Sequence, residues 1–283
     1  MANLKDIRRR IRSVTNIQQI TKAMKMVAAA RLQKAQERAL GSKQYTERLR
    51  EILMNLSAQA DEFSHPLMET PKRGEGRTAY ILMSADKGLA GAYSGNAIKA
   101  LLPLVKDSSQ ADIIAVGRKG RDYFARREYS IVKEYLGISE RPSNQDAIDI
   151  AKEVAELFLS GTYKEVHLVF TQFFSPAHHV PEVVQLLPIQ PETAKKSDVT
   201  YIFEPGEQAV IDWLIPRYME NIVYAALIQS AASELGARMT AMSSATDNAK
   251  ELISDLTLTY NKVRQANITR EITEIVGGAE ALR

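Results

Sequence analysis

The sequence predicts a mixed fold, in which a long antiparallel coiled coil of N- and C-terminal helices carries an inserted α/β domain. Proline and glycine, the strongest local breakers of regular structure, are concentrated in the middle of the chain. Residues 66–205 contain nine of the ten prolines and nine of the fourteen glycines. We therefore predict three parts: an N-terminal coiled-coil helix over 1–65, an α/β domain over 66–205 and a C-terminal coiled-coil helix over 206–283.

The N-terminal part shows the apolar spacing of a long helix. Asn3 is a suitable N-cap, and Asp6 follows three residues later. A stripe at steps of three or four then follows: Ile7, Ile11, Val14, Ile17, Ile20 or Thr21, Met24 and Val27, continued by Leu49, Ile52 or Leu53, and Leu56. This spacing predicts an apolar stripe along one face of the helix.

The C-terminal part repeats this pattern, with no proline and only Gly236 as glycine between Arg217 and Val276. Its stripe consists of Ala249, Leu252, Ile253, Leu256, Tyr260, Val263, Ile272, Ile275, Val276, Ala279 and Leu282. About 60 helical residues would reach about 90 Å, which is too long for a compact domain, and the charges along them exclude a membrane span. A coiled coil remains, and the two end helices can pair with each other in antiparallel packing.

The middle part alternates between short β-type runs and helix-type segments. The β-type runs are 78–84, 113–116, 165–170 and 183–187, and the helix-type segments are 94–105, 118–127 and 146–159. Such alternation predicts βαβ units around a largely parallel sheet. We therefore expect a small Rossmann-like α/β domain between the two helices.

Composition and charge restrict the class of protein. The 283 residues include no cysteine, which excludes disulfides and thiolate metal sites, and we expect neither a secretory signal nor a membrane span. Residues 1–50 carry 13 Lys/Arg against 3 Asp/Glu, a local excess of about +10. This segment could bind nucleic acid, lie on an anionic membrane, face an acidic protein surface or simply be solvated. It lacks the interleaved aromatic residues of the first alternative and the bulky anchors of the second.

Few residues suggest chemistry. The turn Asp86–Gly91 follows the first β-type run, where an α/β domain can hold a phosphate, and Gly117–Gly120 follows the second. Neither has a phosphate-binding glycine motif, so we interpret both as tight strand-to-helix turns. The dipeptide His178-His179, expected in a loop, has no third metal ligand at a suitable spacing, and Glu271 and Glu274 share a helical face that we expect to be solvated. The sequence predicts no catalytic residue, no cofactor and no metal.

Both ends of the chain carry long and specific motifs. The stretch 11–29, IRSVTNIQQITKAMKMVAA, looks like the N-terminal helix of the γ subunit of F-type ATP synthases. ARMTAM at 237–242, ATDNA at 245–249, YNKVRQA at 260–266 and ITREITEIVGGA at 268–279 fit the same family, as does SADKGLAG at 84–91. The resemblance covers the whole chain. It indicates a bacterial member, because the sequence has no cysteine-bearing regulatory insertion and no transit peptide.

This resemblance implies a mechanical role. In the family, the end helices form the central shaft of a rotary motor inside a ring of three α and three β subunits, and the β subunits carry the nucleotide chemistry. The middle domain forms a foot that binds the ε subunit and the membrane-embedded c-ring, so that proton-driven rotation is coupled to ATP synthesis or hydrolysis. The implied protein is non-catalytic and present once per complex. It is peripheral at the cytoplasmic side of the cell membrane, contacts the membrane only through the c-ring and binds no nucleic acid.

The resemblance also assigns roles to particular residues. Arg264, Gln265 and Thr269 match the family's polar contacts with a β-subunit loop. Met24 and Arg238 match positions at the helix interface that are tied to coupling with the β subunits.

At the C-terminal tip, Ile275, Val276 and Leu282 are apolar. The resemblance implies that this tip turns inside an apolar sleeve, and that the basic segment 1–50 faces acidic loops of the β subunits.

Two other functions compete with that of a rotor subunit. A nucleotide-binding enzyme with helical arms would use the Asp86–Gly91 turn, but the missing phosphate-loop motifs argue against it. A free-standing coiled-coil adaptor would bind nucleic acid through residues 1–50, but the specific end motifs argue against that function.

Overall fold

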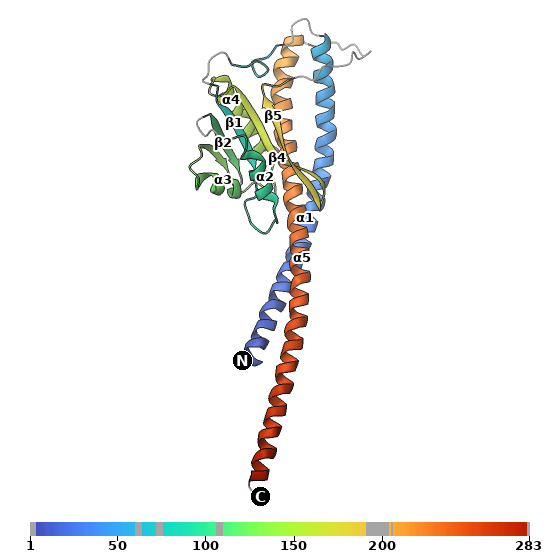
Figure 1. Ribbon diagram of the computed structural model, residues 1–283. Coiled ribbons are helices and arrows are strands. Elements are labelled where there is room, and N and C mark those ends of the chain that lie inside the picture. The colour runs from blue at the N-terminus through green and yellow to red at the C-terminus, as the bar shows by residue number, and fades with distance from the viewer. Residues whose placement is uncertain are drawn as a thin grey trace. The chain divides into compact units, whose positions relative to one another are not determined.

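The computed structural model describes residues 4–59, 64–71, 76–105, 110–190, 204 and 206–281. Its two end helices are long: α1 spans Leu4–Gln59 and α5 spans Glu207–Ala281 (Figure 1). The chain divides into two compact units, one of residues 1–27 and 239–283 and the other of residues 28–238. Each unit contains part of α1 and part of α5. The three-part division at 1–65, 66–205 and 206–283 stays a prediction.

The larger unit, residues 28–238, is built on a five-stranded sheet with the order β3-β2-β1-β4-β5. The strands are β1 (Thr78–Met83), β2 (Ala111–Val116), β3 (Ile131–Tyr135), β4 (Glu165–Ser175) and β5 (His178–Leu187). The first four are parallel, and β5 pairs antiparallel with β4. The predicted α/β domain with a largely parallel sheet is therefore confirmed.

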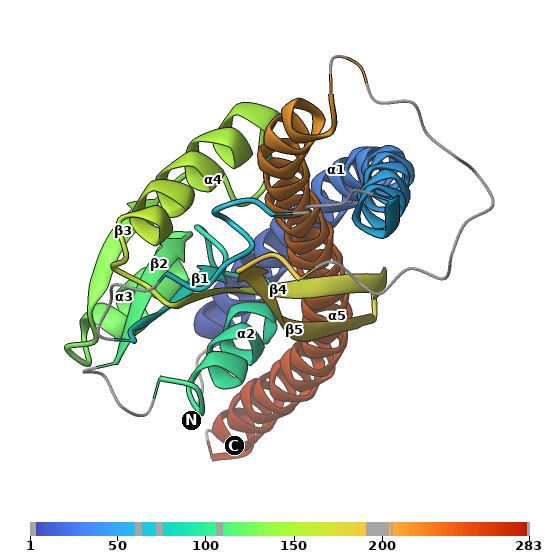
Figure 2. The same cartoon turned by 90° about the horizontal axis from the view of Figure 1, so that it is seen from above.

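Helices cover both faces of this sheet. The helices between the strands are α2 (Tyr93–Leu101), α3 (Arg118–Ala125) and α4 (Asn144–Leu159). Figure 2 shows α2 and α4 on opposite sides of the strands. Alternate residues of β1 point to opposite faces, as strand geometry requires: Tyr80 and Leu82 join the core under α2 and α3, whereas Ile81 and Met83 join the core under α4.

The two long helices contribute to the core on the α4 face. Their buried residues there are Leu49, Leu53 and Leu56 of α1 and Ile211, Leu214, Ile215, Met219, Val223, Ala226 and Leu227 of α5. Burying a side chain of this size stabilises a fold by about 1.5–3 kcal/mol relative to exposure. Within the larger unit, the helices and the α/β domain therefore form one body with a shared core.

Polar side chains of α5 also bond to the backbone of β4. The Ser230 hydroxyl accepts from the N–H of Thr171 at 3.3 Å, and the Ser233 hydroxyl donates to the Thr171 carbonyl at 3.0 Å. The Gln229 side chain accepts from the N–H of Phe173 at 3.2 Å. These directional bonds fix the helix along the strand, which apolar packing alone does not do.

Gly236 allows α5 to approach the β4–β5 turn closely. A Cβ atom at this position would lie 3.1 Å from the Cα of Pro176 and 3.2 Å from the ring of Phe173. The Pro176 backbone therefore occupies the space that a side chain at position 236 would need.

The smaller unit pairs residues 4–27 of α1 with part of α5. Lys25 donates to the Ser243 hydroxyl at 3.0 Å, and Arg8 donates to the Tyr260 hydroxyl at 2.6 Å. Residue numbers rise along one helix while those of the partners fall along the other, so the pairing is antiparallel, as predicted.

The last part of α5 extends past the described part of α1. Arg8 lies opposite Tyr260, so Leu4, one turn earlier, lies level with Arg264, one turn later. From Gln265 onward, no described residue of α1 lies beside α5. The side chains of residues 264–279 are all exposed.

The predicted stripe of α1 is confirmed in part in the smaller unit. Ile7 and Thr21 are buried and Val14 is half-buried, a seven-residue spacing that keeps one seam toward the partner helix. The residues that the prediction wrongly placed in the stripe are exposed: Ile17 (50%), Ile20 (59%) and Val27 (51%). On α5, Leu252 is likewise exposed, whereas Ile253 is half-buried.

Replacing Gly236 with leucine should destabilise the protein by about 1–3 kcal/mol, because the added side chain overpacks against the Pro176 backbone. Gly41 of α1 has no atom within 4 Å of an added Cβ, so Gly41→Leu is the matched control. The control should stabilise by up to about 1 kcal/mol through helix propensity. Urea unfolding followed by circular dichroism measures both effects, and equal effects would contradict the close approach at Gly236.

Candidate functional site

The sheet has one place where α/β proteins commonly bind ligands. The chain adds β2 and β3 on one side of β1 and then adds β4 on the other side. Open α/β sheets bind ligands outside the carboxyl ends of the strands at such a reversal of strand order. The Asp86–Gly91 turn follows β1 at this position, so the phosphate-site candidate lies where a ligand would be expected.

A side chain of the protein takes the place of a phosphate there. The Asp86 carboxylate accepts from the backbone N–H of Arg118 at 3.3 Å, at the start of α3, and from the N–H of Ser139 at 3.1 Å. Burial raises the pKa of Asp86, but the backbone N–H groups of Gly137, Ser139 and Arg118 outweigh it and hold this pKa below its usual value. A helix N-terminus attracts anions, and in this turn the anion is Asp86.

Helix α5 packs against the same turn. Its residue Ala237 forms a buried cluster with Ala85, Ala90 and Tyr93, and Arg238 donates to the carbonyl oxygen of Gly88 at 3.4 Å. Asp86 and α5 therefore both lie at the turn where an α/β sheet of this strand order commonly binds a ligand.

The second glycine turn holds α3 close to β1. Gly117 has φ +90°, and a Cβ there would lie 2.1 Å from the carbonyl oxygen of Ser84. The Ser84 hydroxyl accepts from the N–H of Gly120 at 2.8 Å. Only glycine readily adopts this positive φ at position 117 and leaves room for the Ser84 carbonyl. These features are typical of a tight strand-to-helix turn, which agrees with the interpretation from the sequence.

The two adjacent histidines lie in a strand, so the prediction of a loop was wrong. His178 and His179 begin β5 and pair with Ser175 and Phe173 of β4. Successive side chains of a strand point to opposite faces, so the two rings do not converge. Among the residues that the structure describes, no three His, Cys, Asp or Glu side chains are grouped to hold a metal ion.

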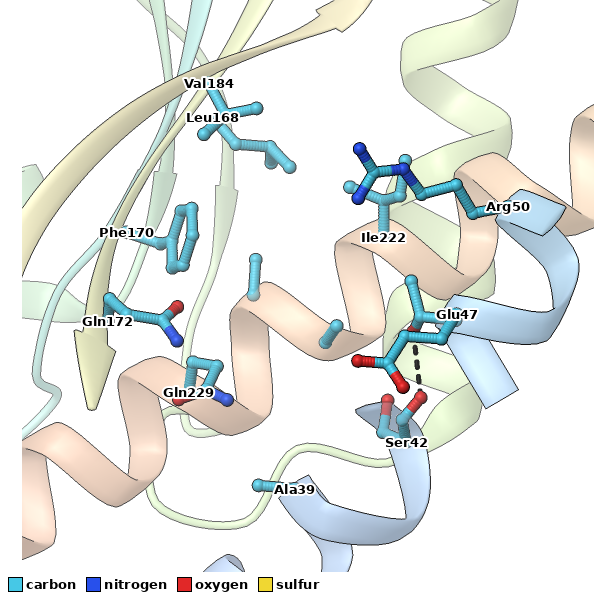
Figure 3. Close-up of a pocket in the computed structure, with 13 residues that line it drawn as sticks. Ala39, Ser42, Glu47, Arg50, Leu168, Phe170, Gln172, Val184, Ile222 and Gln229 are labelled. Atoms are coloured by element: carbon cyan, nitrogen blue, oxygen red, sulfur yellow. Dashed lines mark hydrogen bonds between the residues drawn. The ribbon is translucent and has the colours of Figure 1, made fainter. Parts of the chain in front are cut away.

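A cavity of about 430 Å³ lies in the larger unit, lined by residues of α1, α5, β4 and β5. Leu168, Phe170 and Val184 form its strand wall, and Glu47 and Arg50 reach toward it from α1 (Figure 3). Glu47 is the one carboxylate among the lining residues, which include no histidine or cysteine. This lining therefore offers no acid–base pair for catalysis.

A cluster of charged side chains joins α1, α5, the turn after β1 and the loop between β3 and α4. Arg238 of α5 donates to Glu234, one turn earlier, at 2.6 Å and forms an ion pair with Glu140 at 3.2 Å. Glu140 also pairs with Arg31 of α1 and, at 3.5 Å, with Lys87 of the turn after β1. Glu234 is fully buried, and burial raises its pKa although Arg238 opposes this effect. We call these five residues the Glu140 cluster.

The predicted β-contact residues lie on the exposed part of α5. Arg264, Gln265 and Thr269 are all exposed and follow the last residues that α1 accompanies. Their side chains are available to another protein, and their roles stay predictions.

At the tip, Ile275 is 71% and Val276 is 59% exposed, while Leu282 lies outside the described residues. The exposed Glu274 pairs with Arg270, one turn earlier, at 2.8 Å. Glu271 is exposed as well.

The two predicted coupling residues belong to different units. Met24 is half-buried on α1 in the smaller unit, and Arg238 is buried in the larger unit within the Glu140 cluster. Sequence reasoning singled out Arg238 but missed Glu140 and Arg31. The spacing of Glu234 and Arg238 on one helix signals their pair, whereas nothing in the sequence connects a loop residue such as Glu140 with two distant arginines.

Comparison with known proteins decides the family. Residues 3–282 match the family model described as ATP synthase. The chain is 46% identical to the ATP synthase gamma chain of Heliobacterium modesticaldum over 291 residues, and 46% identical to that of Moorella thermoacetica over 284 residues. Each alignment covers 100% of both chains. The chain belongs to the ATP synthase gamma chain family. The membership that the end motifs predict is confirmed.

Solved structures share the fold of this gamma chain family member. A chain of the Euglena gracilis mitochondrial ATP synthase, from a structure of its OSCP, F1 and c-ring, superimposes with a TM-score of 0.70. It is 18% identical, and the match covers 99% of this chain and 94% of that chain. A chain from the central stalk and c-ring of the Tetrahymena thermophila enzyme gives a TM-score of 0.60 at 24% identity, covering 80% of this chain and 99% of that one.

Removing the charge of Asp86 should weaken the turn that it holds. Asp86→Asn should cost about 1 kcal/mol at neutral pH, as for the loss of a helix cap. Because the pKa of Asp86 is lowered from 3.8 in the folded chain, its stabilisation is present above pH 3.8 and is lost as the pH falls below that value. The difference between wild type and variant should therefore shrink in acid.

Urea unfolding at pH 7 and near pH 3 tests this dependence. Asp149→Asn, which changes an exposed carboxylate of α4, is the matched control. A difference for Asp86→Asn that stays constant with pH would refute the electrostatic account of this turn.

Proposed function

We propose that this chain is the central rotor shaft of an F-type ATP synthase, coupling proton-driven rotation of a c-ring to ATP synthesis or hydrolysis at the β subunits of an α3β3 ring. The single observation that carries this proposal is the exposed end of α5, which continues past the described part of α1 with every side chain from 264 to 279 exposed. An apolar and charged helix end of this kind needs a surrounding protein to cover it.

We propose further that the chain is non-catalytic itself. The position where a Rossmann-like sheet binds a nucleotide is filled by the Asp86 carboxylate and by α5, which supports this proposal. The nucleotide chemistry then belongs to the β subunits, and this chain needs no cofactor.

Its partners are the α and β subunits, the ε subunit and the c-ring, with one copy of the chain in each complex. The titles of the structural neighbours name a central stalk, an F1 part and a c-ring, which supports these partners. No helix in the described ranges is both long enough and apolar enough to cross a membrane. We propose a peripheral position at the cytoplasmic side of the bacterial cell membrane, reached through the c-ring.

The proposed coupling depends on asymmetry. A single rod inside a ring with threefold pseudosymmetry presents a different surface to each β subunit at any moment. Different contacts shift each β subunit toward a different conformation, and rotation passes these conformations around the ring. Arg264, Gln265 and Thr269 supply polar, angle-dependent contacts, and Met24 takes part in coupling from α1.

At the tip of α5, in contrast, the contacts must not depend on the rotation angle. Ile275 and Val276 present apolar surface, and apolar attraction is non-directional. A tip that turns inside an apolar sleeve therefore meets no deep energy minimum at any angle. The basic residues of segment 1–50 act at longer range on acidic loops of the β subunits.

Rotation is the decisive measurement. The chain has no cysteine, so Arg126→Cys, at an exposed position directly after α3, gives a single attachment point for a bead. The variant is assembled with α and β subunits, the ring is fixed to a surface and ATP is added. Stepwise rotation in one direction is expected, and ATP hydrolysis with a stationary bead would overturn the rotor proposal.

Replacing Arg264 and Gln265 together with alanine should lower ATP hydrolysis by the assembled complex roughly fivefold to tenfold, equivalent to about 1–1.4 kcal/mol of lost stabilisation. The fold should stay intact, because both side chains are exposed. The control is Asn248→Ala with Lys250→Ala, which removes one amide and one cation from exposed positions of α5 beside α1. Unchanged hydrolysis in the first variant, or an equal loss in the control, would contradict the assigned contacts.

A further inference from the structure

The Glu140 cluster lies where three parts of the larger unit meet. Glu140 follows β3 and precedes α4 in the α/β domain, whereas Arg31 belongs to α1 and Arg238 to α5. One carboxylate therefore reaches both long helices: one oxygen faces Arg31, and the other lies 3.2 Å from Arg238. Its side chain is 13% exposed.

Three cations share two carboxylates in this cluster, and Glu140 is the carboxylate that all three cations approach. Glu234 and Glu140 face Arg238 and Arg31, and Lys87 completes the rim at 71% exposure. Arg238 is 7% exposed, so water does little to screen its charge. Without the Glu140 charge, three cations would share the single carboxylate of Glu234.

The two arginines lie where the long helices leave the larger unit, so their contacts can restrain these helices against the α/β domain. The larger unit comprises residues 28–238, so Arg31 and Arg238 are near its limits on the two long helices. Leucine and isoleucine side chains hold the helices against the sheet farther along, at Leu49 and Ile215 for example. Apolar packing is non-directional and tolerates sliding. By contrast, the charge-assisted hydrogen bond from Arg31 to Glu140 fixes both distance and angle. The contact between Arg238 and Glu140 is an ion pair in a buried position, where the attraction between charges is strong.

We propose that Glu140 is a torsional clamp, a positioning residue that locks both long helices to the α/β domain where they leave the larger unit. This inference rests on the proposed rotor function, because only a rotating shaft must carry torque from the α/β domain into two helices. Glu140 acts through Arg31 and Arg238 and touches no substrate. The mutual bond of Glu234 and Arg238 keeps the second arginine in place for it.

The test measures stiffness directly. The complex with α and β subunits is fixed through its ring and stalled without ATP, and a bead on the introduced thiol of the Arg126→Cys chain reports thermal fluctuations of the angle. Glu140→Gln removes the carboxylate charge while both arginines stay ionised, which weakens both contacts, so the angular variance should rise. Glu134→Gln is the control, because Glu134 is a partly exposed carboxylate of the same domain that pairs with Arg121.

A second variant guards against a folding defect. Arg31→Gln removes the more exposed of the two arginine partners of Glu140, at 34% exposure, and should also raise the variance. The double variant Arg31→Gln/Glu140→Gln should add little to Glu140→Gln alone, because both changes break one contact. ATP hydrolysis by the same complexes should stay near the wild-type rate, since a merely destabilised chain would lose assembly and hydrolysis together.

The outcomes separate the two proposals. Unchanged variance in both single variants, with a wild-type complex that rotates, would overturn the clamp and leave the rotor function standing. An equal rise in the Glu134→Gln control would also overturn it. A wild-type chain that assembles but never rotates would overturn the rotor function and the clamp with it.

Discussion

The packing of α5 against β4 determines what the rest of the larger unit can do. Ser230 and Ser233 bond to both backbone groups of Thr171, and Gly236 allows the helix to approach the Pro176 backbone. In this position α5 contributes to the core on one face of the sheet and packs against the turn after β1. A sheet with the strand order of a nucleotide-binding domain thus becomes a support for a helix.

Charged groups near that turn are likewise satisfied by side chains of the chain itself. In a ligand-binding α/β domain, an anion brought by the ligand completes the helix N-terminus. Here Asp86 completes it from within the chain, and the nearby Glu140 carboxylate pairs with cations of α1, α5 and the turn. Breaking a buried pair costs more than forming it gains, so such clusters define geometry more than they add stability. The proposed transmission of torque needs such a defined geometry.

Much of the architecture could be predicted because two signals were strong: proline and glycine punctuation, and apolar periodicity over long segments. The signals failed where local pattern and tertiary environment differ. β3 lies at the sheet edge with Val132, Lys133 and Glu134 exposed, so it has no buried apolar run to find. His178 and His179 lie between prolines, which is typical of a loop, but the strand β4 beside them supplies pairing partners. Ile17 and Ile20 have helical spacing yet are exposed. Of the two residues predicted for one stripe position, Ile20 and Thr21, it is Thr21 that is buried and bonds to Thr246.

The error on α1 has a physical explanation that bears on function. With Ile17, Ile20 and Val27 in the seam, the helix would bury its large apolar residues within the chain. Instead Thr21 lies in the seam, and these three residues stay exposed.

The end of α5 shows the same property, with Ile268, Ile272 and Ile275 exposed. A helix that propagates from a paired segment has no new nucleation cost, so this end can form without a neighbour in the chain. Its exposed apolar residues still favour a covering partner. For its own pairing, the smaller unit uses polar contacts such as Thr21–Thr246 and Lys25–Ser243 beside buried apolar residues such as Ile7 and Met242. Large apolar residues such as Ile17, Ile20 and Val27 stay exposed, which is the division of surface that the proposed shaft within a ring requires.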